Sequence, residues 1–153
     1  MPDFSEIPWI AAHIKLYQTD PVKAHIWDST AVGGPGPLAT LLLTTKGRKS
    51  GAPRPLPLIY GKAGDSYVVI ASKGGMPAHP LWYRNLEAEP VCEVQVGAKR
   101  LRARARVATG EERERLWKQM AEIYPPYLAY QEATQRTIPV VVLDPVTSRS
   151  SGA

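Results

Sequence analysis

The stretch from residue 91 to 107 constrains the fold of this chain more than any other. It predicts a β-hairpin in which a single antiparallel register pairs apolar residues on one face and polar or charged residues on the other. Two β-prone runs, 91–96 and 100–107, flank a Gly-Ala turn. In this register apolar residues face each other on an inner side, and polar or acidic residues face arginines on an outer side. The pairs are Val94 with Leu101, Cys92 with Ala103, Glu93 with Arg102, and Gln95 with Arg100.

The second strand of this hairpin carries arginines at every other position. Because alternate residues of a strand share a face, these side chains form one outward row. The row consists of Arg100, Arg102, Arg104 and Arg106. We interpret it as a solvated face; a nucleic-acid surface is the alternative.

Prolines mark a second strand. The run 54–60 contains Pro55 and Pro57, two apart, so both remove an N–H donor from the same side of the strand. That side must be a sheet edge or face a ligand. A turn at 61–65 leads to a further strand at 66–72, and apolar runs at 38–45 and 138–143 predict two more.

Helical signals lie between these strands. Ile7, Ile10, Ala11 and Ile14 follow the spacing of a helix face within 4–17, with Pro8 in the first turn. Further helices are predicted at 79–88, at 109–122 with Thr109 and Glu112 at capping-box spacing, and at 124–131.

About six mostly antiparallel strands with three or four short helices indicate an α+β antiparallel barrel. We expect an N-terminal helix with a Gly/Pro-rich loop at 1–37, one barrel domain that binds a cofactor at 38–147, and a flexible tail at 148–153.

Composition restricts the function classes. The 19 Lys and Arg against 14 Asp and Glu give a net charge of +5, which favours anionic partners. The single cysteine excludes an internal disulfide and a CxxC metal site, and it suits a reducing compartment. No run is long and apolar enough to predict a membrane-spanning helix.

Two loops have the composition of an anion site. Residues 44–51, TTKGRKSG, combine cations, hydroxyls and glycines after a strand, but a Walker A motif cannot be threaded through them. Residues 71–75, ASKGG, leave another strand toward the helix that begins near Pro80. For each loop by itself, a solvated turn is the alternative interpretation. The two loops together favour a site that binds a long polyanion.

Aromatic residues follow. Trp82 and Asn85 are three apart on the helix after the second loop, while Tyr124, Tyr127 and Tyr130 recur every third residue, which suits a flat ring but also core packing. No Ser-His-Asp, Cys-His, paired-carboxylate or metal-ligand set can be assembled, so reactive atoms are expected to belong to a bound cofactor.

The segments LLLTTKGRKSG, PLIYG, VVIASKGG, HPLWYRNL, YPPYLAYQ and RTIPVVVLDP, in this order, resemble the deazaflavin-dependent nitroreductases, also described as F420-dependent quinone reductases of the split-barrel type. The resemblance covers about residues 38–145. It implies an FMN-binding split-barrel-like fold, coenzyme F420 as cofactor, and hydride transfer to a quinone, activated alkene or nitroaromatic.

The resemblance also assigns residues. The phosphate and tail would contact Arg48, Lys49, Ser50 and Gly51. The deazaflavin and its side chain would contact Leu58, Tyr60, Ile70, Ala71, Ser72, Lys73, Gly74, Gly75, Pro80, Trp82 and Asn85. Thr44 and Tyr127 complete the cofactor set. Tyr124, Tyr127 and Tyr130 would contact the acceptor, with Tyr130 and Tyr124 as candidate catalytic hydroxyls.

An FMN-dependent split-barrel reductase and a non-catalytic F420-binding protein remain as alternatives. The resemblance implies a cytoplasmic protein with a small hydrophobic acceptor and no nucleic-acid partner. It leaves open the oligomeric state and a weak peripheral contact of the N-terminal segment with the inner face of the membrane.

Overall fold

The computed structural model describes residues 8–28, 35–72 and 79–146. Within them lie eight strands and five helices. The strands are β1 Ile26–Asp28, β2 Pro37–Lys46, β3 Pro53–Ile59, β4 Gly61–Ala63, β5 Ser66–Ile70, β6 Val91–Val96, β7 Lys99–Val107 and β8 Val140–Pro145. The helices are α1 Pro8–Thr19, α2 Pro21–Ala24, α3 Leu81–Ala88, α4 Gly110–Ile123 and α5 Pro126–Ala133.

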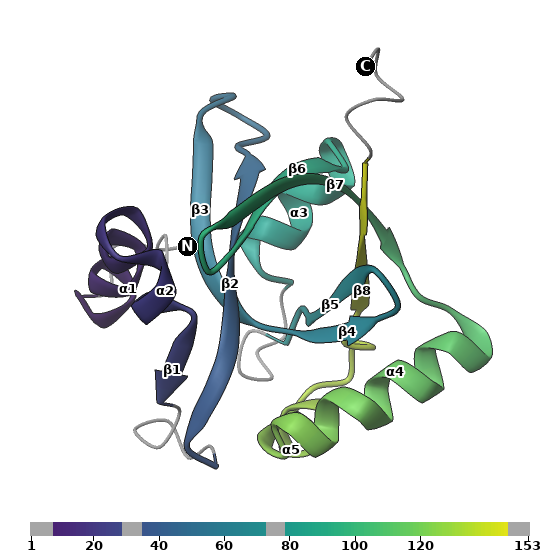
Figure 1. Cartoon of the computed structure of the whole chain (residues 1–153). Helices are drawn as coiled ribbons and strands as arrows, with labels where there is room; N and C mark the ends of the chain where they lie inside the picture. The colour runs from purple at the N-terminus through teal and green to yellow at the C-terminus, as the bar shows by residue number, and fades with distance from the viewer. Residues whose placement is uncertain (1–7, 29–34, 73–78, 147–153) are drawn as a thin grey trace.

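All strand pairs are antiparallel, and together they form one curled sheet (Figure 1). The strand order is β1-β2-β6-β7-β8-β5-β4, with β3 paired to β2 off this path. β2 is the longest strand: its first residues pair with β1, and its later part lies between β3 on one edge and β6 on the other. The result is an α+β split-barrel fold, as predicted.

The sheet is buried on both faces at β5 and β8, which explains their continuous apolar sequences. Tyr67 and Val69 of β5 face a core that α3 completes with Trp82 and Leu86. The alternate residue Val68 faces a second core, formed with α4 and α5. Figure 1 shows these two helices together at the lower right of the sheet.

The predicted β6–β7 hairpin is confirmed pair for pair. Its four outward arginines are all exposed, but Gln95 is only 8% exposed rather than on an open face. The expectation was wrong there because Gln95 lies beside Leu42 of β2, on a face of the sheet against which α1 packs. Its amide donates to the Gly97 carbonyl at 3.2 Å.

The proline-rich strand lies at an edge of the sheet, which is one of the two predicted arrangements; the other was a side that faces a ligand. β3 pairs with β2 alone among the described strands, with Pro55 opposite Thr44 and Pro57 opposite Leu42. The expected turn at 61–65 is shorter than predicted, because 61–63 form β4, which pairs with β5 around Gly64.

Helix ends within the described residues agree with the predictions to within two residues, while the predicted start at residue 4, and Ile7, lie outside the described part. Two details were wrong. Ala11 is exposed, and the buried face of α1 instead includes His13 and Tyr17, which hydrogen-bond to Ala24 and Thr40. The capping box does not form, because the Glu112 carboxylate accepts bonds from Arg106.

The short elements α2, β1 and β4 were not expected. Each has three or four residues, too few for a periodic pattern to identify. α2 and β1 join α1 to the sheet through β2. The boundary between 37 and 38 stays a prediction, and residues 148–153 lie outside the described part.

Candidate active site

The turn between β2 and β3 is built to hold a tight conformation. Gly47 donates to the Ala52 carbonyl at 2.8 Å and accepts from Gly51 at 2.7 Å. A Cβ on Gly47 would lie 3.0 Å from Ser50 Oγ and 3.2 Å from the Ala52 oxygen, and Gly51 has φ +75. Glycine is therefore favoured at both positions, at Gly47 by the close contacts and at Gly51 by the positive φ.

Asn85 fixes this turn from helix α3. Its buried amide donates to Thr45 Oγ1 at 3.0 Å, and its carbonyl accepts from the Arg48 backbone N–H at 3.2 Å. The sequence assigned Asn85 to the cofactor. In the structure both ends of its amide bond to protein, which holds the segment that carries Arg48, and its contact with the cofactor stays a prediction.

A groove of about 380 Å³ runs beside this turn. Three cations, Arg48, Lys49 and Arg54, lie at one part of its lining, and Leu56, Leu81 and Trp82 supply apolar walls. The remaining lining residues are Gly47, Ser50, Pro55 and Asn85. Such a lining fits an elongated ligand with an anionic end and an apolar end.

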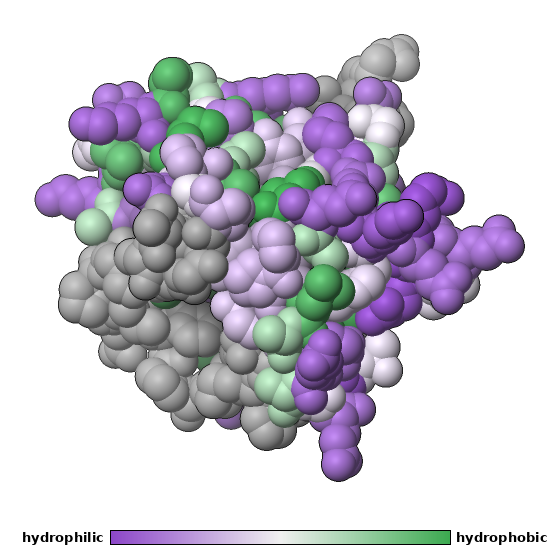
Figure 2. Space-filling view, turned by 90° about the horizontal axis from the view of Figure 1, so that it is seen from below, coloured by the Kyte–Doolittle hydropathy of each residue, from purple (hydrophilic) through white to green (hydrophobic). Residues whose placement is uncertain are grey.

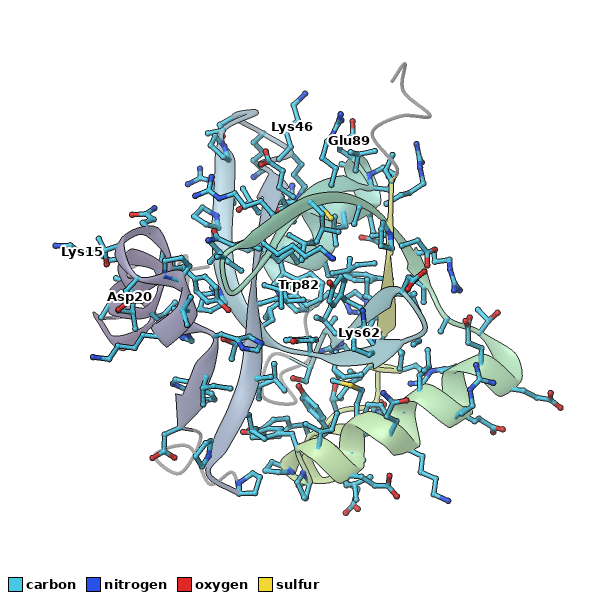
Figure 3. The ribbon with its side chains drawn as sticks, in the orientation of Figure 1. Lys15, Asp20, Lys46, Lys62, Trp82 and Glu89 are labelled. Carbon is cyan, nitrogen blue, oxygen red and sulfur yellow. The ribbon has the colours of Figure 1, made fainter. Side chains whose placement is uncertain are left out.

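Figure 3 labels Trp82 near the centre of the molecule, and Lys46 beside the outer end of the β2–β3 pair. Trp82 is 5% exposed and packs in the core beneath the sheet. It also lines the groove, and its predicted contact with the cofactor stays a prediction.

Arg54 was not predicted to belong to the site. A signal was available, because Arg54, Leu56, Leu58 and Tyr60 alternate along β3 and so share one face. Leu56, Leu58 and Tyr60 all pack against the core that contains Trp82. The edge strand thus carries a charge at the groove and apolar residues beyond it.

Tyr60 lies at the end of this row. Its ring packs edge-on against Tyr67 at 5.6 Å, and its hydroxyl bonds to His25 Nε2 at 2.9 Å. Burial, and to a lesser extent Tyr67, raises the pKa of the Tyr60 phenol. No pattern in the sequence pointed to His25 as the partner of Tyr60.

Thr44 and Ile70 lie away from this face. Thr44 lines a separate depression of about 370 Å³ together with Glu93 and Arg102. Ile70 is buried in the core that α4 and α5 form. The adjacent residues Thr45 and Ala71 instead pack on the side of α3, because neighbouring residues in a strand point to opposite faces.

The end of β5 is held by an arginine that was not singled out. Arg136 donates to the Ala71 carbonyl at 3.2 Å and to the Ser72 carbonyl at 2.7 Å, and it contacts His79 Nδ1 at 3.0 Å. Pro80 caps α3 just beyond His79. The predicted ligands Lys73, Gly74 and Gly75 lie outside the described residues.

The three tyrosines form one cluster, as their spacing suggested, and it belongs to the same core as Ile70 rather than to the core beside the groove. Tyr124 and Tyr127 are buried against α4, and Tyr130 is partly exposed beside them. The hydroxyls of Tyr124 and Tyr130 lie 3.1 Å apart. Burial is the main cause of the raised pKa values of Tyr124 and Tyr127, so both phenols are neutral at physiological pH.

The face that α4 and α5 present is mixed in character. Figure 2 shows strongly hydrophilic side chains on the side where α4 lies, with paler and apolar residues toward the centre. Leu128 of α5 is 49% exposed. Among the helices of the described residues, none is long and apolar enough to cross a membrane.

A curled split-barrel sheet with a basic turn, an apolar groove and a tyrosine cluster defines a class of protein that binds a flat cofactor with an anionic tail. The F420H(2)-dependent quinone reductase family model matches residues 23–145. The chain belongs to this family. Coenzyme F420 is therefore its cofactor, and its activity is that of an oxidoreductase.

Individual relatives of known sequence or structure support the same family assignment. F420H(2)-dependent quinone reductase Rv1261c of Mycobacterium tuberculosis is 44% identical over 112 residues, 71% of this chain and 75% of the relative. The solved F420-H2 dependent reductase FDR-A is 47% identical with a TM-score of 0.64, over 69% of this chain and 93% of that one.

Two further structures extend the comparison of folds. One, described as a domain-swapped dimer, is 38% identical with a TM-score of 0.67 and covers 90% of this chain and 98% of its own. The heme storage protein HutZ of Vibrio cholerae is 20% identical with a TM-score of 0.54, over 71% of this chain and 82% of that one. HutZ shares the fold alone.

Proposed function

We propose that this chain reduces a quinone, or a similarly flat activated alkene or nitroaromatic, with F420 bound along the groove beside the β2–β3 turn. When bound, reduced F420 supplies the hydride. The observation that carries the proposal is the groove itself, in which Arg48, Lys49 and Arg54 lie at one part and Leu56 and Trp82 at another.

The residues present fit this cofactor. A phosphodiester and a glutamate tail need several cations, and three line the groove. Exposed cations bind an anion best when the backbone that carries them is held in place, and Asn85 holds that of Arg48. Leu58 and Tyr60, on the same face of β3 as Leu56, would contact the ring.

The tyrosine cluster would contact the acceptor. Quinone reduction needs a proton as well as a hydride, and the neutral phenol of Tyr124 can hold one. The 3.1 Å contact joins its hydroxyl to that of Tyr130, which is the more exposed of the pair. We assign Tyr130 as the residue that donates the proton to the acceptor, and Tyr124 as the residue whose hydroxyl hydrogen-bonds to that of Tyr130.

Titration of the purified protein with oxidised F420 tests the proposal, with FMN in a parallel titration. We expect micromolar or tighter binding of F420 and weaker binding of FMN. The double substitution Arg48→Ala and Lys49→Ala should weaken F420 binding roughly 10- to 100-fold and flatten its salt dependence, since each lost charged hydrogen bond costs about 1.5–3 kcal/mol before solvent screening reduces it.

Arg102→Ala is the matched control, because Arg102 is also exposed but lines the other depression. It should leave F420 binding unchanged. Failure of the wild-type protein to bind F420 at micromolar concentration would refute the proposal. Tight binding without turnover of menadione and reduced F420 would support the non-catalytic alternative.

A further inference from the structure

Arg136 lies in the connection between α5 and β8, yet its guanidinium reaches the end of β5. Its Nη2 donates to the Ser72 carbonyl at 2.7 Å, and its Nη1 donates to the Ala71 carbonyl at 3.2 Å. Nη1 also lies 3.0 Å from His79 Nδ1, at the start of the segment that leads into α3. One planar side chain thus bonds to the segment that precedes residues 73–78, at Ala71 and Ser72, and to the segment that follows them, at His79.

The same connection is tied to the tyrosine helix. Gln131, directly after Tyr130 in α5, donates through Nε2 to the Arg136 carbonyl at 2.8 Å. Its Oε1 accepts from the Ile138 N–H at 3.0 Å. The backbone of Arg136 is therefore fixed to α5, while its side chain is fixed to the end of β5.

The chemistry of these contacts matters for an anion. Carbonyl oxygens carry partial negative charge, and two of them at a strand end would oppose a nearby phosphate. The guanidinium of Arg136 compensates both. Because a trans peptide directs its N–H opposite to its C=O, holding the Ala71 carbonyl also sets the direction of the Ser72 N–H.

From these contacts, and resting on the proposed function, we infer that Arg136 is a positioning residue that couples the two halves of the active site. Its guanidinium orients the Ala71–Ser72 strand end on the cofactor side. Because Gln131 bonds to the backbone of Arg136, the same guanidinium anchors to that strand end the connection that leads from the helix bearing Tyr127 and Tyr130, on the acceptor side. Arg48 and Lys49, by contrast, are assigned to cofactor binding alone.

The contact with His79 requires that Nδ1 has no proton, so that it can accept from Arg136. Burial, and then the charge of Arg136, lowers the pKa of His79, with Glu87 opposing and Arg84 adding to the effect. The Tyr83 ring packs at 4.7 Å on the same imidazole. His79 is therefore a neutral acceptor at neutral pH.

Amide hydrogen exchange of the cofactor-free protein tests the coupling directly. We expect Arg136→Ala to speed exchange about 10-fold or more in two places at once, at Ala71 and Ser72 and along α5. Gln119→Ala is a matched control, because the Gln119 side chain also donates to one backbone carbonyl of another element, that of Lys62 in β4, at 2.8 Å. Its effect should be limited to α4 and β4.

Binding and turnover provide the second readout. Arg136→Ala should raise the F420 dissociation constant about 10-fold and lower kcat as well, whereas Arg48→Ala should raise the dissociation constant with little change in kcat. Should Arg136→Ala not fold, Arg136→Lys keeps the charge without the planar fork and should show the same pair of effects at smaller size.

Exchange that changes at one segment only, or at neither, would overturn the inference, as would a normal F420 dissociation constant in a folded Arg136→Ala protein. If the wild type does not bind F420, the proposed function fails. The exchange experiment then still decides whether Arg136 couples the two segments.

Discussion

At the scale of single residues, the site depends on side chains that bond to other parts of the protein. Asn85 bonds to Thr45 and Arg48, and Arg136 bonds to Ala71 and Ser72. In both pairs a side chain from one element fixes the backbone of another. Such residues affect cofactor affinity through the backbone that they hold.

Asn85→Ala should therefore lower stability and cofactor affinity together. Two hydrogen bonds of a buried amide are lost, which costs roughly 2 kcal/mol in the free energy of unfolding. Urea denaturation and F420 titration measure the two effects. Gln95→Ala removes another buried amide, one that bonds within the β6–β7 turn, and should reduce stability while leaving F420 affinity unchanged. Equal loss of affinity in both variants would contradict this role for Asn85.

Tyr130→Phe keeps the aromatic ring and removes the hydroxyl that contacts Tyr124. If this hydroxyl donates the proton to the acceptor, kcat for menadione should fall roughly 100-fold, with the F420 dissociation constant unchanged. Steady-state kinetics with reduced F420 measure this. Tyr83→Phe, at a buried tyrosine on α3, is the comparison and should retain kcat; a Tyr130→Phe enzyme with normal kcat would exclude the hydroxyl as donor.

At the scale of elements, ion pairs join the start of α4 to the sheet. Arg106 of β7 donates to Glu112 at 2.6 and 2.9 Å and to Asp144 of β8 at 2.7 Å. These contacts take the place of the predicted capping box. They connect the helix that supports the tyrosine cluster to the two strands beneath it.

The pairs predict a pH dependence. Hydrogen bonds from Arg106 lower the pKa of Glu112, while Ser66 and Arg106 lower that of Asp144 against the opposing effect of burial. A carboxyl with a depressed pKa in the folded state binds fewer protons than in the unfolded state, so stability rises with pH there. Stabilisation is thus complete above the ordinary values of 4.5 and 3.8 and is lost as pH falls below them.

Arg106→Ala should accordingly reduce the urea midpoint at pH 7 and show a shallower decline in acid than the wild type. Arg104→Ala, at an exposed neighbour on the same row, should retain the wild-type profile. The prediction fails if the wild type and Arg106→Ala lose stability in parallel between pH 5 and pH 3.

At the scale of the whole molecule, two cores on either side of β5 and β8 leave the single thiol inaccessible. Cys92 is 4% exposed, and its Sγ donates to the Ala103 carbonyl at 3.6 Å. Burial, with a smaller effect of Glu93, raises the pKa of the Cys92 thiol to about 12. The thiolate that reacts with disulfides is therefore scarce near neutral pH.

Cys92 should thus report on unfolding. A disulfide reagent such as dithionitrobenzoate at pH 8 should label the native protein slowly, and the rate should rise sharply through the urea transition. F420 at saturating concentration should slow labelling further, because a ligand that binds only the folded state reduces the unfolded population. Rapid labelling of the native protein would show that the β6–β7 hairpin opens independently.

The sequence by itself determined the local structure and the chemistry. The hairpin register follows from matching two faces of a strand, the edge position of β3 from prolines that cannot donate, and the anionic ligand from cations set among glycines. Each of these depends on residues close together in the chain, where spacing alone is informative. Gln95 was misplaced because its neighbour on that face, Leu42 of β2, and the helix α1 that packs there lie more than fifty residues away in the sequence.

The tertiary structure alone decided which side chains serve the site indirectly. Arg54 joins the groove because β3 pairs with β2, and Arg136 reaches Ala71 because β8 lies beside β5. Asn85 meets Arg48 across 37 positions of sequence. Such contacts are set by the way distant segments pack in three dimensions, and no periodicity along the chain encodes them.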